Sequence, residues 1–163
     1  MFAVPADTVP FLAPAETHPA LIARDLTDDF TDGVARWAHL LRYDPDRPAA
    51  TLVERTGSQE VWLVGWLPGQ GRRWHTHDAV SGAFTVVSGV LTERVARSGE
   101  VSAYRVETGR TRVCGQRHRH EVVNDGPDPA VSVHVYRTAT APGVCRFDPV
   151  TGRYLGPAPA AAR

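Results

Sequence analysis

A pair of histidines in a glycine frame, together with a third histidine far downstream, constrains the fold of this chain more than any other feature. The frame reads Gly69-x5-His75-x-His77-x4-Gly82-x6-Gly89, and His120-x3-Asn124 follows it. Side chains alternate along a strand with a period of two, so an extended segment sends His75 and His77 to the same face. His120 completes a triangle of metal ligands with them only if the sheet curls into a barrel. The spacing therefore predicts a metal site and a closed β fold together.

From Thr51 onward, short β-rich runs alternate with turn residues. The runs cover residues 61–67, 83–87 and 131–136, and the turn signals include Pro68-Gly69, Ser88-Gly89 and Asn124-Asp125-Gly126-Pro127. Many short antiparallel strands without intervening helices favour a β-sandwich or a small barrel, and jelly rolls protect their edges in this way. We therefore expect a mainly β fold.

The two ends of the chain show different patterns. Residues 1–16 hold three prolines among small residues and predict an extended arm, and residues 157–163 predict a frayed, Ala/Pro-rich tail. Residues 17–43 carry apolar side chains at spacings of three and four, which predicts a helical segment that ends at the turn of residues 44–48. With 163 residues and no internal repeat, residues 1–163 are expected to form one domain.

The composition excludes several classes of partner. Eighteen Lys and Arg residues balance eighteen Asp and Glu residues, so no broad basic surface attracts nucleic acid or an anionic membrane. No apolar run approaches the roughly 20 residues of a membrane-spanning helix, and the first basic residue is Arg24, so the charged start of a signal peptide is missing. We expect a cytoplasmic protein with a small-molecule partner. Cys114 and Cys145 form no Cys-x-x-Cys pair and are expected to be free thiols.

These motifs resemble those of a known superfamily. Gly69-x5-His75-x-His77 with Gly89 is similar to the first cupin motif, and Gly109-x5-Gly115 leading to His120-x3-Asn124 resembles the second. The resemblance implies a cupin, or double-stranded β-helix (jelly-roll), barrel over residues 50–148, preceded by the helical segment. The order of the helical segment, His-x-His, Leu91-Thr92-Glu93, His120 to Asn124 and Ser132 to Tyr136 is, more narrowly, similar to the cysteine dioxygenase family of thiol dioxygenases, bacterial type.

One departure from the usual cupin pattern defines the ligand set. A typical cupin supplies a glutamate ligand after His-x-His, but Gly82 stands at that position and has no side chain to offer. Three neutral imidazoles leave a divalent metal with its full +2 charge and, if it is octahedral, three open positions for an anionic substrate and O2. Ligand type alone does not choose among Fe, Zn, Cu and Ni; the resemblance implies Fe(II). It also implies that the cysteine–tyrosine crosslink of mammalian members cannot form between residue 82 and Tyr136.

A polar row is predicted on the strand that contains Ser132, His134 and Tyr136. These residues lie at i, i+2 and i+4, so they share one face while valines occupy the other. A buried hydroxyl or imidazole costs roughly 1–3 kcal/mol if it is left without a partner, so a Ser–His–Tyr hydrogen-bond chain inside the barrel is expected. The resemblance implies a catalytic role for the three, with Tyr136 orienting the bound thiol and oxygen or supplying a proton.

The third ligand and the substrate anchor have alternatives. His118 lies two residues before His120, which is preferred because of its spacing to Asn124. A thiol amino acid needs a cation for its carboxylate, ideally a bidentate arginine. The resemblance places that arginine just before the strand near Thr51, where this chain has Ala49 and Ala50. Arg47 and Arg146 are the two candidates to replace it.

The leading hypothesis is a mononuclear non-heme iron thiol dioxygenase that converts L-cysteine or a related small thiol to a sulfinic acid with O2. Fe(II) would be held by His75, His77 and His120. One alternative is a different oxidative conversion of cysteine at the same site in specialised biosynthesis. Another is a cupin that binds a metal or ligand without turnover, and a third is a hydrolytic or isomerising metal cupin. The oligomeric state stays open, a monomer included.

Overall fold

The computed structural model describes residues 37–55, 59–77, 81–115 and 117–137, and the backbone of residues 145–147 and 154–157. The extended arm expected at residues 1–16 and most of the helical segment expected at 17–43 lie outside the described residues. The last part of that segment contains a short 3-10 turn, η1 (Ala38–Leu40). Pro157, expected to begin a frayed tail, instead ends a short strand; residues 158–163 lie outside the described part.

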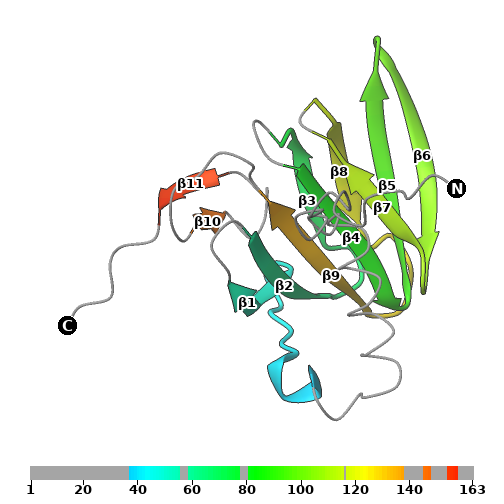
Figure 1. Ribbon diagram of the computed structural model, residues 1–163. Coiled ribbons are helices and arrows are strands. Elements are labelled where there is room, and N and C mark those ends of the chain that lie inside the picture. Colours follow the sequence, from blue (N-terminus) through cyan, green and yellow to red (C-terminus); the bar gives the residue numbers. More distant parts are fainter. Residues whose placement is uncertain are drawn as a thin grey trace, which may run out of the picture.

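The fold is mainly β, as the sequence predicts. Its strands are β1 (Ala49–Arg55), β2 (Gln59–Trp66), β3 (Gly71–His75), β4 (Ser81–Ser88), β5 (Val90–Arg97), β6 (Glu100–Glu107), β7 (Thr111–Cys114), β8 (Arg119–Val123), β9 (Ala130–Arg137), β10 (Cys145–Phe147) and β11 (Tyr154–Pro157). One sheet has the order β1-β2-β9-β4-β7, a second has the order β3-β8-β5-β6, and β10 pairs with β11. Figure 1 shows the two larger sheets side by side, with β9 and β4 at the centre of one and β8 and β5 in the other.

The pairings within both larger sheets are antiparallel, and several join strands distant in sequence. β9 lies between β2 and β4, and β8 lies between β3 and β5. Such alternation of strands between two sheets is the arrangement of a jelly roll. The predicted double-stranded β-helix is therefore the fold that these residues adopt.

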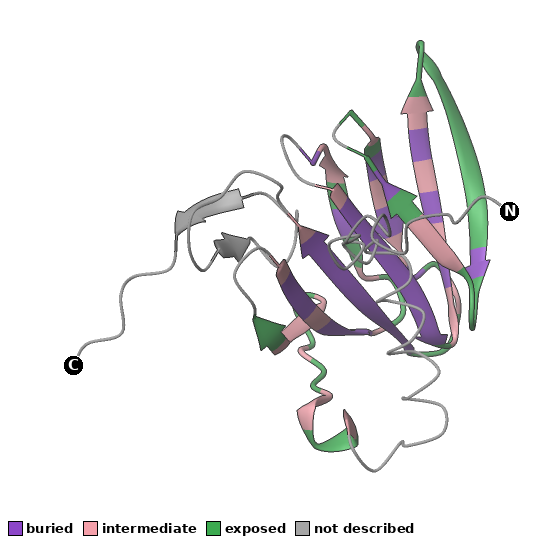
Figure 2. Ribbon diagram, viewed as in Figure 1, coloured by how far each residue is buried: buried purple, intermediate pink, exposed green. Residues whose placement is uncertain are grey.

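The main core lies between the two sheets. Its members come from strands of both sheets: Val64, Trp66, Phe84, Val86, Leu91, Val106, Cys114, Val122 and Ala130. Figure 2 shows β2, β4 and β9 almost wholly buried, whereas β6 at the edge of the second sheet is mostly exposed. The polar residues of the central strands are therefore enclosed by apolar walls.

A second core covers the opposite face of the five-stranded sheet. Val131, Val133 and Val135 of β9 contribute to it, and Trp37, Leu40 and Leu41 pack against it from the segment that precedes β1. Because β9 alternates with a period of two, its other side chains face the interior between the sheets. The predicted polar row Ser132, His134 and Tyr136 lies on that interior face, and all three are buried.

Two glycines of the sequence frame serve as turn residues. Gly69 has φ +81° and Gly89 has φ +78°, a left-handed conformation that side chains other than glycine adopt at a cost. A Cβ on Gly89 would also lie 2.8 Å from the carbonyl oxygen of Pro129. These positions explain why the histidine motif is framed by glycine. Within the part of the chain that the structure describes, no helix has the length and apolar character needed to cross a membrane.

Candidate metal centre

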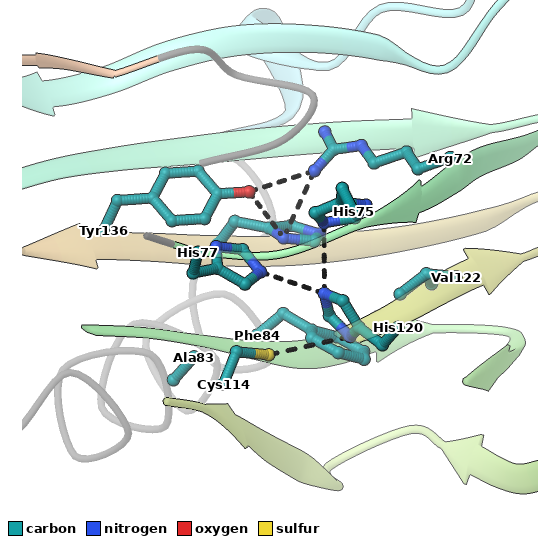
Figure 3. Close-up of a pocket in the computed structure, with 10 residues that line it drawn as sticks. Arg72, His75, His77, Ala83, Phe84, Cys114, His120, Val122 and Tyr136 are labelled. Atoms are coloured by element: carbon teal, nitrogen blue, oxygen red, sulfur yellow. Dashed lines mark hydrogen bonds between the residues drawn. The ribbon is translucent and has the colours of Figure 1, made fainter. Parts of the chain in front are cut away.

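The three predicted histidines converge inside the barrel. His75 ends β3, His77 follows two residues later, and His120 lies on β8 directly opposite His75 in the strand register. The Nε2 atom of His120 lies 2.9 Å from Nε2 of His77 and 3.1 Å from Nε2 of His75. The three rings thus present one nitrogen each to a common point (Figure 3), and they form a group able to hold a metal ion.

The hydrogen bonds on the far side of two rings fix which nitrogen carries the proton. His120 Nδ1 lies 2.7 Å from the carboxylate of Glu93, and His75 Nδ1 lies 2.7 Å from the carbonyl oxygen of Arg73. Both oxygens only accept, so each Nδ1 carries the hydrogen and each neutral ring has a lone pair on Nε2. The Nε2 atoms of His120 and His75 lie 3.1 Å apart, so their lone pairs repel one another unless a cation lies between them. The protein therefore holds these nitrogens in the form and place that a metal requires.

The donor set fits a divalent metal. Neutral imidazole suits Fe, Zn, Cu and Ni, and three such ligands would leave coordination positions open for exogenous ligands.

Burial keeps two of the candidate ligands, His77 and His120, neutral. Desolvation, followed by the neighbouring His120 and His75, lowers the pKa of His77 to about 2. Desolvation also lowers the pKa of His120, although its bond to Glu93 acts in the opposite direction. Metal ligation requires neutral imidazole. The unprotonated state is thus the native one at neutral pH, before any metal binds.

The same shifts predict acid sensitivity of the metal-free protein. Burial lowers the folded-state pKa of His77, His120 and His134, so the unfolded chain binds more protons than the native one below about pH 6.5, and stability is lost as the pH falls from there. Each histidine contributes up to about 1.4 kcal/mol per pH unit. We expect urea denaturation of the metal-free protein to show a loss of about 2–3 kcal/mol per pH unit between about pH 6 and 5. In His77→Gln the slope should shrink by about a third, because one of three contributing histidines is lost. Equal stability at neutral and mildly acidic pH would contradict the assignment.

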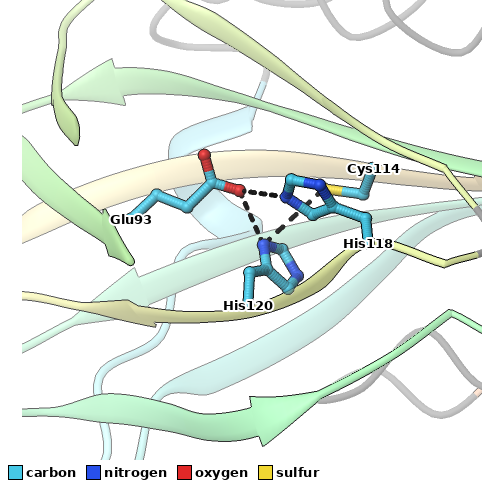
Figure 4. Close-up of side chains that lie close together, drawn as sticks. All are labelled: Glu93, Cys114, His118 and His120. Carbon is cyan, nitrogen blue, oxygen red and sulfur yellow. Dashed lines mark hydrogen bonds and ion pairs between the residues drawn. The ribbon is translucent and has the colours of Figure 1, made fainter. Parts of the chain in front are cut away.

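Glu93 supports His120 from behind and was given no role in the sequence analysis. Its carboxylate is fully buried and bonds His120 Nδ1 at 2.7 Å and His118 Nε2 at 2.9 Å (Figure 4). It also bonds the Nε of Arg112. Burial raises its pKa, but the bonds from His118, His120 and Arg112 outweigh that effect and hold the pKa of Glu93 well below its usual range. A charged carboxylate that orients a ligand imidazole is a common support in metal sites.

The alternative ligand His118 is bound to Glu93 in this arrangement. It belongs to a second group of potential ligand atoms, with Glu93, Cys114 and His120, and not to the group of three converging Nε2 atoms. Cys114 is a buried free thiol, as expected, with its Sγ 3.8 Å from His120 Nδ1. Burial raises the pKa of the Cys114 thiol, which keeps it protonated. The side chain of Cys145 lies outside the described part of the structure.

The polar row of β9 forms a hydrogen-bond chain with a defined direction. Trp66 Nε1 donates to Ser132 Oγ at 2.8 Å, and Ser132 Oγ lies 2.8 Å from His134 Nε2. The serine hydroxyl accepts from the indole N–H and makes a second hydrogen bond with His134. The other ring nitrogen, Nδ1, lies 3.3 Å from the hydroxyl of Tyr136. A continuous hydrogen-bond chain therefore connects Trp66 to Tyr136 through Ser132 and His134.

Tyr136 stands at the edge of the candidate metal site. Its ring stacks on that of His77, with centroids 5.9 Å apart, and its hydroxyl also receives a hydrogen bond from Arg72 Nη1 at 3.1 Å. Arg72 and His134 thus hold the phenol oxygen in place. Tyr136 lines a small cavity together with the three histidines, His134 and Arg72.

Arg72 is a second site residue, after Glu93, whose role was not predicted from the sequence. It is 3% exposed, and it lines the cavity beside Tyr136 (Figure 3). Regular alternation along β3 would send residue 72 away from His75, three positions on. The register is irregular between Arg72 and His75, and this irregularity turns both side chains toward the interior.

Neither arginine predicted as a substrate anchor can be placed at the cavity. The side chain of Arg47 is 80% exposed and pairs with Asp44 at 3.6 Å; it does not line the cavity of the three histidines. Arg146 lies in β10, and its side chain is outside the described residues. Of the predicted site residues, the structure thus brings together the three histidines and the row of β9.

The fold and the converging histidines define a cupin-type metal-dependent enzyme. The sequence matches the family model described as cysteine dioxygenase type I over residues 15–149. The chain belongs to the cysteine dioxygenase type I family, which confirms the family that the sequence motifs indicated and places it among dioxygenase-like oxidoreductases. No curated protein matches this sequence closely enough to count as a relative.

Solved structures share the fold at low sequence identity. The protein TT1209 from Thermus thermophilus is 23% identical with a TM-score of 0.57, and the match covers 62% of this chain and 92% of that one. An uncharacterized protein with a double-stranded β-helix domain from Klebsiella pneumoniae is 22% identical with a TM-score of 0.57, over 64% and 89% of the two chains. An oxalate oxidase in complex with glycolate is 20% identical, with a TM-score of 0.50, over 62% and 55%. These likenesses support the cupin fold.

Proposed function

We propose that this protein is a mononuclear non-heme iron thiol dioxygenase that acts on L-cysteine or a related small thiol. The observation that carries the proposal is the convergence of three Nε2 atoms, with two tautomers fixed by Glu93 and the Arg73 carbonyl, beside a tyrosine aimed by its own hydrogen-bond chain. Membership of the cysteine dioxygenase type I family supports it. Iron as the metal and a cytoplasmic location are part of the same proposal.

The overall reaction adds both atoms of O2 to one sulfur, R–SH + O2 → R–SO2H, so sulfur is oxidised and O2 is reduced without another reductant. Iron, when bound by His75, His77 and His120, would supply the open coordination positions and the redox chemistry for this transfer. Tyr136 orients the ligand through its hydroxyl and holds the proton at that oxygen. The apolar residues Ala83, Phe84 and Val122 line the same cavity and limit the entry of water.

The direct test is oxygen consumption by anaerobically purified, Fe(II)-loaded protein given L-cysteine, with the product identified by mass. A gain of two oxygen atoms, absent in His75→Ala, supports the proposal. Absence of uptake with L-cysteine, 3-mercaptopropionate and other small thiols, with iron shown to be bound, would refute it. Uptake with a different product would instead assign another oxidative conversion to the site.

Tyr136→Phe is expected to slow oxygen consumption about 100-fold, a typical contribution of one positioned proton donor. Iron content should not change, because no predicted ligand is altered. Tyr104→Phe is the matched control, since Tyr104 is 42% exposed on the edge strand β6, and it should retain full activity. Measurement of kcat and iron content for both variants checks the assignment; a Tyr136→Phe enzyme as fast as the wild type would show that the phenol takes no part.

A further inference from the structure

Arg72 is a buried cation with incomplete hydrogen bonding. Its Nη1 bonds the hydroxyl of Tyr136 at 3.1 Å and lies 3.5 Å from Nδ1 of His134, while its guanidinium carbon lies 5.1 Å from the ring centroid of Trp66. Its Nε and Nη2 atoms are buried and have no hydrogen-bond partner. Among the described residues, no ion pair joins Arg72 to a carboxylate. A buried charge in this state is costly unless a ligand completes it.

The positive charges around the cavity favour a ligand with two negatively charged groups. A divalent metal on three neutral histidines brings +2, and Arg72 adds +1 on the same cavity. Two buried carboxylates lie near the site, and both already have partners. Glu93 is bonded to Arg112, His118 and His120, and Glu60, opposite Tyr136 in the strand register, is bonded to Arg55 and Trp62. A thiolate together with an acid group compensates the metal and the arginine, respectively. Because Nε and Nη2 are adjacent on the guanidinium, they are able to bind both oxygens of one carboxylate.

We propose that Arg72 binds the carboxylate of the substrate, so that the site selects small thiols that carry an acid group. This inference rests on the proposed function and deepens it. It assigns the anchor to β3, the strand that also carries His75, and not to the exposed Arg47. Tyr136 then links the two halves of the site, because its hydroxyl contacts Arg72 while its ring stacks on His77.

The test compares two thiols that differ in charge but hardly in size, 3-mercaptopropionate and 3-mercaptopropionamide. Their dissociation constants are measured by calorimetry on the Fe(II)-loaded protein without oxygen, so that binding is separated from turnover. Wild type is expected to prefer the acid about 100-fold, the usual size of a lost charged contact. Arg72→Gln should reduce the preference to about threefold or less. Arg72→Lys should keep about tenfold, because an ammonium cannot bind both oxygens at once.

Arg105→Gln is the matched control. Arg105 lies on the edge strand β6 and its side chain is 70% exposed, so this variant loses the same charge and should keep the full preference. Arg72→Met removes the buried charge without replacing it and is expected to melt at an equal or higher temperature than the wild type in the absence of ligand. If folded Arg72→Met also loses the preference for the acid, the lost binding is not caused by unfolding.

Three results would overturn the assignment: no preference in the wild type, an undiminished preference in Arg72→Gln, or loss of the preference in Arg47→Gln in place of Arg72→Gln. Failure of the proposed dioxygenase function would give a different set of results. A preference for the acid that depends on Arg72, without oxygen consumption on any thiol, would support the anchor and refute the dioxygenase. Oxygen consumption with cysteamine as fast as with L-cysteine would refute the anchor alone.

Discussion

His120→Ala is expected to abolish metal binding, whereas His118→Ala is expected to preserve it. His120 is the histidine that contacts both other candidate ligands through one nitrogen, so its loss leaves two ligands and weakens binding on the order of 100- to 1,000-fold. His118 contacts Glu93 instead, and its loss should cost about tenfold or less. Metal content of both variants after desalting, measured by mass spectrometry, checks the difference.

Together with a third variant, His77→Ala, these substitutions decide between the two groups of potential ligands. If His118→Ala loses the metal and His77→Ala retains it, the ion is held by the group of Glu93, Cys114, His118 and His120. If His120→Ala and His77→Ala both lose it while His118→Ala does not, the three converging histidines hold it. The first outcome would contradict the proposed centre.

Glu93→Ala is expected to destabilise the metal-free protein by about 3 kcal/mol. Removal of one partner from a buried ionic network costs roughly 3–5 kcal/mol, and the lower end applies because the side chain of Arg112 is 32% exposed and is partly solvated. For a chain of this size the melting temperature should fall by roughly 6–12 °C. Denaturant titration of the metal-free variant gives the free energy directly.

The control for this variant is Glu107→Ala. Glu107 also pairs with an arginine, Arg105, but the two side chains are 60% and 70% exposed, and exposed pairs contribute about 0–1 kcal/mol. A loss in Glu93→Ala no larger than in Glu107→Ala would show that the buried carboxylate is not a structural centre. Reloading with metal adds a second readout, because His120 without its partner should bind metal about 10- to 100-fold more weakly.

The site residues that could be predicted from the sequence lie on a strand with regular alternation. β9 keeps its period of two from end to end, so Ser132, His134 and Tyr136 lie on the interior face as the alternation predicts. Gly69 and Gly89 mark turns because their backbone conformations suit glycine. In both cases local geometry decides the outcome, and local geometry can be predicted from neighbouring residues.

The parts that the sequence did not reveal depend on register. Arg72 faces the cavity because β3 is irregular between residues 72 and 75, and no period derived from the sequence contains that shift. Glu93 reaches His120 because β5 and β8 are adjacent, with Val95 opposite His120 and Glu93 opposite Val122. The sequence alone does not specify which strands are neighbours. Arg47, chosen for its closeness along the chain, is instead a surface residue paired with Asp44.

The hydrogen-bond chain on β9 limits how Tyr136 can use its proton. Trp66 heads the chain through an indole N–H that neither accepts a proton nor gives one up at physiological pH. If the phenol released its hydrogen during a turnover, no reservoir behind Ser132 and His134 would restore it. Replenishment would have to come through the cavity, from the incoming thiol or from a water molecule that accompanies it. Each catalytic cycle would then be coupled to substrate arrival, and in the resting enzyme the Tyr136 hydroxyl would stay protonated until the next thiol binds.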